Sequence, residues 1–127
     1  MEYRFMTHEG CYDLVANARL VGDDLLVAIW GGDRPHIGAV SMAQPRASLR
    51  DPSKLSATAS VFTYVGHKED ILAKPASETL ASALNKKVVV TAGIHWDDME
   101  EKGIKRVIKN CEILIGMIVK EFSSSKS

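Results

Sequence analysis

The sequence predicts an α+β fold with two layers, in which helices cover one face of a mainly antiparallel sheet. Three features of the pattern support this fold class. Apolar residues alternate with period two in the N-terminal half, as they do in half-buried strands. From residue 68 onward they recur with helical period, and a short valine run separates two helical segments. We therefore expect a meander of about four strands, followed by a helix, a strand and a helix.

The first two strands are expected at residues 12–21 and 24–30. The first alternates apolar and polar residues, whereas the second is a nearly continuous apolar run. Gly22 and Asp23 lie between them, and a glycine in the first position of a two-residue connection suits a type II′ hairpin turn. These two strands should therefore be antiparallel neighbours.

Two further strands are expected at residues 36–43 and 55–65, after a break at residues 31–35. The second of them is rich in β-branched and aromatic residues. Residues 44–55 contain two prolines and several charged residues, so they are expected to form a loop. Loops of this length are often functional or mobile.

The remaining elements are a helix within residues 68–85, a buried strand at residues 87–93 and a last helix. Pro75 should either open the main part of the first helix or kink it, because a proline inside a helix removes a hydrogen bond. The last helix is expected to carry a broad apolar stripe from Ile104 to Phe122.

Length and composition indicate one globular domain, residues 1–122, and a serine-rich tail, residues 123–127, that is expected to be disordered. The 16 basic and 16 acidic residues give a formal net charge of zero, whereas a general nucleic-acid binder needs an excess of cations. We expect no signal peptide and no membrane-spanning helix. The zero charge and the width of the last apolar stripe predict self-association, as a homodimer.

No complete catalytic or metal-binding motif is found in the sequence. The nucleotide-binding glycine motifs, the zinc-protease motif and paired cysteines are absent, and we assign no catalytic residue and no metal. Cys11 and Cys111 are distant in sequence and should be reduced, which fits a cytoplasmic protein. His36, His67 and His95 all lie at expected strand ends and could converge, although loop hydrogen bonds explain each of them as well.

Arginines in the expected loops are candidates for holding a phosphate. Arg34 and Arg46 flank the third strand, and a guanidinium matches the geometry of phosphate oxygens. The alternative is that they form surface ion pairs with the neighbouring Asp33 and Asp51. We expect both arginines to reach one site across the third strand.

Aromatic and acidic residues give further expectations. Trp30 ends an apolar run and is expected in the core, whereas Trp96 follows a strand end and is expected to be exposed, where it could stack on a planar ligand. Asp98 and Glu101 match a capping box at the start of the last helix.

Four segments give the chain a resemblance to a known family. They are residues 31–40 (GGDRPHIGAV), 43–46 (AQPR), 66–70 (GHKED) and 90–95 (VTAGIH). In their order and spacing the chain resembles the small LpdD-like prenylated-flavin chaperones, which are named after an accessory protein of hydroxybenzoate (gallate-type) decarboxylase systems. Their fold is similar to that of the proteasome-assembly chaperones. The resemblance covers residues 31–95, half of the chain.

The resemblance implies a helper protein that is not itself an enzyme. Such a protein would support maturation or cofactor loading of a UbiD-like decarboxylase that carries prenylated FMN. The chain could instead be an assembly factor that contacts only protein, or a small enzyme with His67 or His95 as general base. From position and chemistry, the residues we expect to contact a flavin cargo are Arg34, His36, Gly38, Arg46, His67 and His95.

Overall fold

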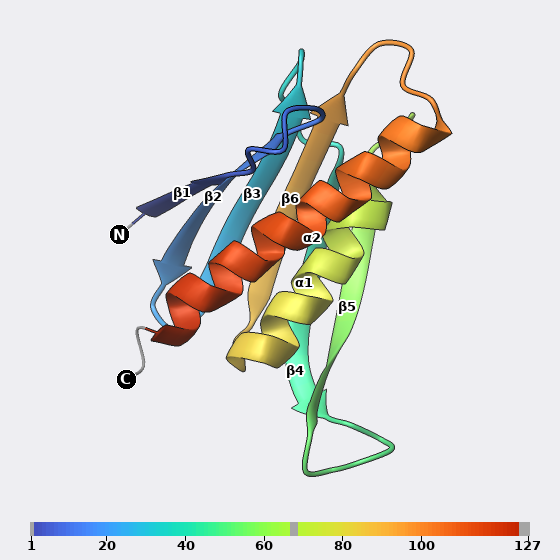
Figure 1. Ribbon diagram of the computed structural model, residues 1–127. Coiled ribbons are helices and arrows are strands. Elements are labelled where there is room, and N and C mark those ends of the chain that lie inside the picture. The colour runs from blue at the N-terminus through green and yellow to red at the C-terminus, as the bar shows by residue number, and fades with distance from the viewer. Residues whose placement is uncertain (1, 67–68, 125–127) are drawn as a thin grey trace.

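The computed structural model describes residues 2–66 and 69–124 and has one sheet with two helices (Figure 1). The elements in chain order are β1 (Glu2–Met6), β2 (Leu14–Val21), β3 (Asp24–Gly32), β4 (Ala39–Ala47), β5 (Leu55–Thr63), α1 (Asp70–Leu84), β6 (Val88–His95) and α2 (Glu101–Ser124). Both helices lie on the same face of the sheet, α2 over β1 and β2, and α1 over β4, β5 and β6. The predicted α+β fold class is therefore confirmed.

The order of the strands differs from a simple meander. The sheet has six strands in the order β1-β2-β3-β6-β4-β5, so β6 lies between β3 and β4. It runs parallel to β3, and every other pairing is antiparallel. β6 is hydrogen-bonded on both sides, and α1 packs on one of its faces, where Val88 and Val90 are buried; Val89, on the face without helices, is half-buried. Pairing between distant segments cannot be read from local patterns, so this insertion was not predicted.

The hairpin of β2 and β3 has the predicted form. β2 and β3 are antiparallel, with Val21 opposite Asp24 and two residues between them. Gly22 adopts a φ of 63°, a conformation that glycine accepts without strain, whereas Asp23 keeps a negative φ. This combination is that of a type II′ turn.

The strand β1 was missed by the sequence patterns. It is five residues long and pairs with β2 at the edge of the sheet. Its alternate residues Tyr3 and Phe5 are half-buried, and the ring of Tyr3 packs edge-on against Phe122 of α2 at 5.2 Å. A pattern of only two alternating apolar residues is too short to identify a strand from the sequence.

The strand β4 begins and ends later than expected. It extends through Gln44 to Ala47, so the loop to β5 is shorter than predicted. Pro45 lies within the strand, opposite Ala57 of β5. This is tolerated because β4 pairs with β6 only as far as Ala43, and the proline nitrogen faces the side of β4 that has no partner.

The helices agree with the apolar periods of the sequence. Pro75 lies inside α1 and does not open it. The apolar stripe of α2 is largely used within the fold, since Val107, Leu114, Ile118 and Phe122 are at most 2% exposed. Its width is therefore no longer a reason to expect a dimer. The helix continues to Ser124, and residues 125–127 of the expected tail lie outside the described residues.

Candidate functional site

Glycines and histidines from three segments meet at one end of the sheet. The ends of β3 and β6 and the loop between β3 and β4 converge there, as the sequence suggested. The Asp33 N–H donates to the carbonyl of His95 at 2.8 Å, and the Gly38 N–H donates to the carbonyl of Ala92 at 2.9 Å. These bonds attach the loop to β6.

Glycine is required at two positions in this region. A Cβ on Gly93 would overlap the carbonyl group of His36. Gly32 has a φ of 89°, and a Cβ there would overlap the carbonyl of His95. The close approach of the three backbone segments therefore depends on these glycines.

His36 connects the loop to a buried carboxylate. Its Nε2 lies 3.1 Å from Oε1 of Glu69, whose side chain is only 8% exposed, and its Nδ1 lies 2.8 Å from the carbonyl oxygen of Arg34. Both partners are hydrogen-bond acceptors, so each ring nitrogen of His36 lies within hydrogen-bond distance of an acceptor oxygen. Gly38 leaves room for the Glu69 carboxylate, because a Cβ on Gly38 would overlap it.

Glu69 is a site residue that sequence reasoning missed. It lies in the segment GHKED that carried part of the resemblance, and it comes directly before α1. An isolated glutamate before a helix is normally solvent-exposed, so no pattern signalled its burial. The signal available was its position beside a glycine–histidine pair.

His95 also has an acidic partner. Its Nε2 lies 3.0 Å from Oδ1 of Asp97, and its side chain is 37% exposed. By strand alternation it lies on the face of the sheet that the helices do not cover. His36 and His95 are thus brought to one end of the sheet, whereas His67 lies outside the described residues.

The two candidate phosphate-binding arginines are separated. Arg34 lies in the loop at the glycine–histidine end, while Arg46 lies near the other end of β4. Ala39 and Arg46 are separated by seven residue steps of extended strand, roughly 23 Å. One site built from both arginines is therefore not formed, because β4 continues straight where a loop was expected.

The expected surface ion pairs are also absent in the described part of the chain. Arg46 donates from Nε to the Thr58 hydroxyl at 2.8 Å and from Nη1 to the carbonyl of Ala47 at 3.1 Å. Asp51 accepts from the hydroxyl and N–H of Ser53, which lowers the pKa of its carboxyl group. Arg34 is exposed and forms no ion pair with a described residue, so its guanidinium is available to an anion.

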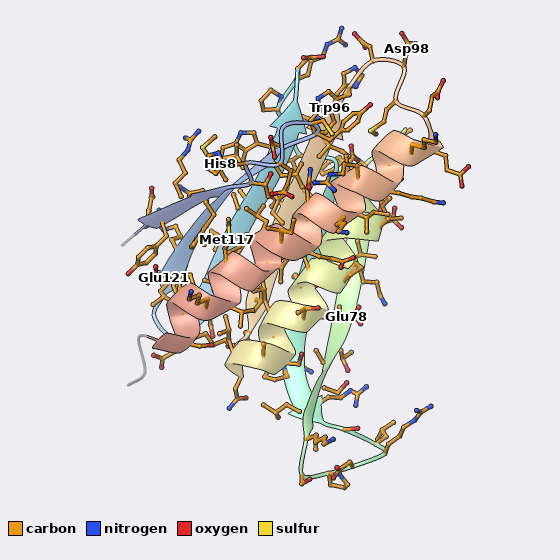
Figure 2. All side chains as sticks on the ribbon, viewed as in Figure 1. His8, Glu78, Trp96, Asp98, Met117 and Glu121 are labelled. Carbon is orange, nitrogen blue, oxygen red and sulfur yellow. The ribbon has the colours of Figure 1, made fainter. Side chains whose placement is uncertain are left out.

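The two tryptophans have the opposite placement from the one expected. Trp96, which is labelled in Figure 2, packs against the core. Its ring meets Tyr12 edge-on, with the ring centroids 5.1 Å apart. Trp30 lies on the uncovered face of the sheet, with the guanidinium carbon of Arg4 6.0 Å from its ring. Asp98 lies at the outer tip of the loop before α2 with a φ of 55°, and the helix begins at Glu101, so Asp98 is not its cap.

Another polar residue organises the neighbouring loop between β1 and β2. The Asp13 carboxylate accepts hydrogen bonds from the Thr7 hydroxyl at 2.6 Å and from the N–H groups of Glu9 and Gly10 at 2.8 and 3.0 Å. These bonds, the one from Thr7 above all, lower the pKa of Asp13. The loop is a fixed part of the fold on the helix side of the sheet.

The uncovered face of the sheet carries a broad apolar surface. Three of its exposed members are Leu26, Met42 and Phe62, which are 38%, 59% and 63% exposed and come from three different strands. Leu26 and Met42 both lie beside Val89 of β6, so apolar side chains run across the centre of the sheet. A hollow of about 400 Å³ opens beside Met42. Large exposed apolar patches on a protein mark interaction surfaces.

Neither a cluster of metal ligands nor a helix that could span a membrane is found among the described residues. No group of three histidine, cysteine, aspartate or glutamate side chains lies close enough there to hold a metal ion. None of the helices in residues 2–66 and 69–124 is long and apolar enough to cross a membrane.

A family model and a curated relative agree with the sequence resemblance. Residues 8–123 match the model of the prenylated flavin chaperone LpdD-like domain. Protein LpdD of Lactiplantibacillus plantarum is 28% identical over 100 residues, which are 79% of this chain and 70% of that protein. A chain from the crystal structure of a chaperone complex for yeast 20S proteasome assembly aligns with a TM-score of 0.47 at 12% identity, over 91% of this chain and 98% of that one. The family model covers nearly the whole chain, and the protein therefore belongs to the LpdD-like prenylated flavin chaperone family.

Proposed function

We propose that this protein is a non-catalytic cytoplasmic chaperone that supports loading of prenylated FMN into a UbiD-like decarboxylase of aromatic acids of the hydroxybenzoate or gallate type. The observation that carries this proposal is the match of residues 8–123 to the prenylated flavin chaperone family. The two free cysteines are consistent with a reducing compartment.

The uncovered apolar face is the surface proposed to bind the decarboxylase. Exposed apolar patches mark interaction surfaces, and Leu26, Met42 and Phe62 form such a patch for a client protein. Charged residues lie toward the margin of this face, where Arg19 pairs with Glu2 and Lys87 with Asp24. An apolar centre with a polar rim is the usual composition of a protein interface.

The flavin phosphate is proposed to bind at the glycine–histidine end of the sheet. Arg34 supplies the cation, since its guanidinium forms no ion pair with a described residue. The contacts of His36 with the Arg34 carbonyl and with Glu69 hold this loop in place, and the proposed site also includes Gly38 and His95. His67 remains a prediction, and Arg46 is excluded from the phosphate site by its distance along β4.

A flavin titration tests the cargo site. A charge-assisted contact contributes about 1.5–3 kcal/mol, so Arg34→Ala should weaken binding of FMN or prenylated FMN about ten- to a hundredfold. Arg34→Lys should recover part of this loss, because lysine keeps the positive charge but lacks the planar guanidinium that binds two phosphate oxygens at once. Arg46→Ala is the matched control, which removes an equal charge at the other end of β4 and should leave the affinity unchanged.

The second candidate is an assembly factor that binds only protein, and the exposed apolar face favours it equally. In this case wild-type protein is retained on a column that carries immobilised decarboxylase and yet binds neither FMN nor prenylated FMN. That result would support this alternative and contradict the cargo site. Met42→Glu should abolish retention in either case, because it places a charge in the apolar centre. Retention of that variant at the wild-type level would contradict the client-binding surface.

A further inference from the structure

The two edges of the sheet differ in how well they are protected from pairing with another strand. An edge strand presents unpaired N–H and C=O groups, which proteins usually protect with charges, proline or short length. β1 is short and carries Glu2 and Arg4, whereas β5 has nine residues (LSATASVFT) without charge or proline. β5 has β4 on one side, and no strand of the described residues lies on its other side.

The outward groups of β5 can be assigned from the bonds on its inner side. The N–H of Tyr64 donates to the carbonyl of Gly38, which continues the register of β4 and β5. Even-numbered residues of β5 therefore face β4, because the direction of backbone groups alternates along a strand. The N–H and C=O groups that point outward belong to Leu55, Ala57, Ala59, Val61 and Thr63.

From this geometry we infer that β5 pairs in antiparallel fashion with β5 of a second copy, about a twofold axis at Ala59. In this register Ala59 faces Ala59 of the second copy, Ala57 faces Val61, and Leu55 faces Thr63. All three are pairs of outward-pointing residues, so every free donor and acceptor of the edge finds a partner. The inference is independent of the proposed flavin and decarboxylase functions.

The sequence of β5 favours a second copy over another partner. Any charge near a twofold axis meets the same charge of the other copy, and β5 carries none over its whole length. The small side chain of Ala59 at the axis avoids a clash, and Val61 is 37% exposed on the side where the facing residue would be Ala57. The formal net charge of zero adds no repulsion between copies.

The contact is about 30 Å long and narrow, and even interfaces of standard size can be as weak as micromolar, so we expect a reversible dimer with a dissociation constant on the order of 10 μM. Sedimentation equilibrium of the full chain over a concentration series measures it. Ala59→Pro removes an outward N–H without touching the bonds to β4, and should raise the dissociation constant at least about tenfold. Ser60→Lys places like charges beside the axis from an exposed position and should have a similar effect.

The matched control is Met6→Lys, which places a lysine at an exposed position on the other edge strand and should dimerise as the wild type does. Circular dichroism verifies that each variant is folded, and Ser60→Lys decides the result if the proline variant is not. Hydrogen exchange should show Ala57, Ala59 and Val61 amides protected only at dimer-forming concentrations. A monomer at tenfold above the expected dissociation constant, or a dimer that Ser60→Lys leaves unchanged, would overturn the inference. Protection of these amides by an added decarboxylase instead of by concentration would also overturn it.

Discussion

Asn110 provides a direct test of how α2 is attached to the rest of the fold. Its side chain is fully buried, and Nδ2 donates to the carbonyls of Cys11 and Tyr12 at 3.0 and 2.8 Å. Tyr12 has a φ of 53°, a conformation that needs support from its surroundings. Asn110 therefore holds the loop between β1 and β2 against the helix.

The cost of losing this contact follows from its two hydrogen bonds. Each contributes about 1 kcal/mol net, so Asn110→Ala should lower the free energy of unfolding by about 2 kcal/mol. Asn110→Asp should be worse than the alanine variant at neutral pH, because it places a buried carboxylate against two carbonyl oxygens. Lowering the pH should recover part of that difference, since a protonated carboxyl can donate one bond.

Urea unfolding of the three proteins measures these differences. Lys109→Ala is the control, because it changes the exposed neighbouring position of α2 and should alter stability by less than about 0.5 kcal/mol. An alanine variant as stable as the wild type, or an aspartate variant no worse than the alanine variant, would refute the role of Asn110.

Three further predictions follow from the same structure. Burial raises the pKa of the Cys111 thiol to about 12. At pH 8 a thiol reagent should therefore modify only Cys11 in native protein and both cysteines in unfolded protein. Two reactive thiols in native protein would contradict this. The pKa of Asp13 is lowered in the fold, so the stabilisation by its carboxylate is present above pH 3.8 and is lost as the pH falls further. Asp13→Asn should therefore flatten the acid side of a plot of unfolding free energy against pH. An unchanged plot would count against this role. Gly93→Ala should destabilise by about 1–3 kcal/mol through overlap with His36, whereas Gly116→Ala, in open space on α2, should be neutral or stabilise by up to about 1 kcal/mol, as thermal unfolding would show.

Local patterns predicted most of the elements but not their pairing. The glycine-first turn at Gly22 and the valine run of β6 could be identified because turn geometry and burial leave local signals. The position of β6 between β3 and β4 leaves no such signal. Pro45 led to the prediction that β4 ends before it. Proline cannot occupy a position whose N–H must donate to a neighbouring strand, but it is tolerated where its nitrogen faces no strand.

The site was predicted in part for the same reason. His95 ends β6, and His36 lies in the short loop before β4, so their convergence followed once these strands were neighbours. Arg46 was assigned to the same site only because β4 was expected to end before it. The burial of Glu69 depends on the missing side chain of Gly38 and on His36, a three-residue arrangement that spans distant parts of the sequence.

The central claim is that this protein promotes loading of prenylated FMN into a decarboxylase. The most direct measurement is the fraction of a UbiD-like decarboxylase that carries the cofactor when it is produced, in cells that make prenylated FMN, with and without this protein. We predict a higher cofactor-bound fraction when the protein is present, a smaller gain with Met42→Glu, and no turnover of the aromatic acid by the isolated protein. Equal cofactor content with and without the protein, or decarboxylation by the protein alone, would contradict the proposed function.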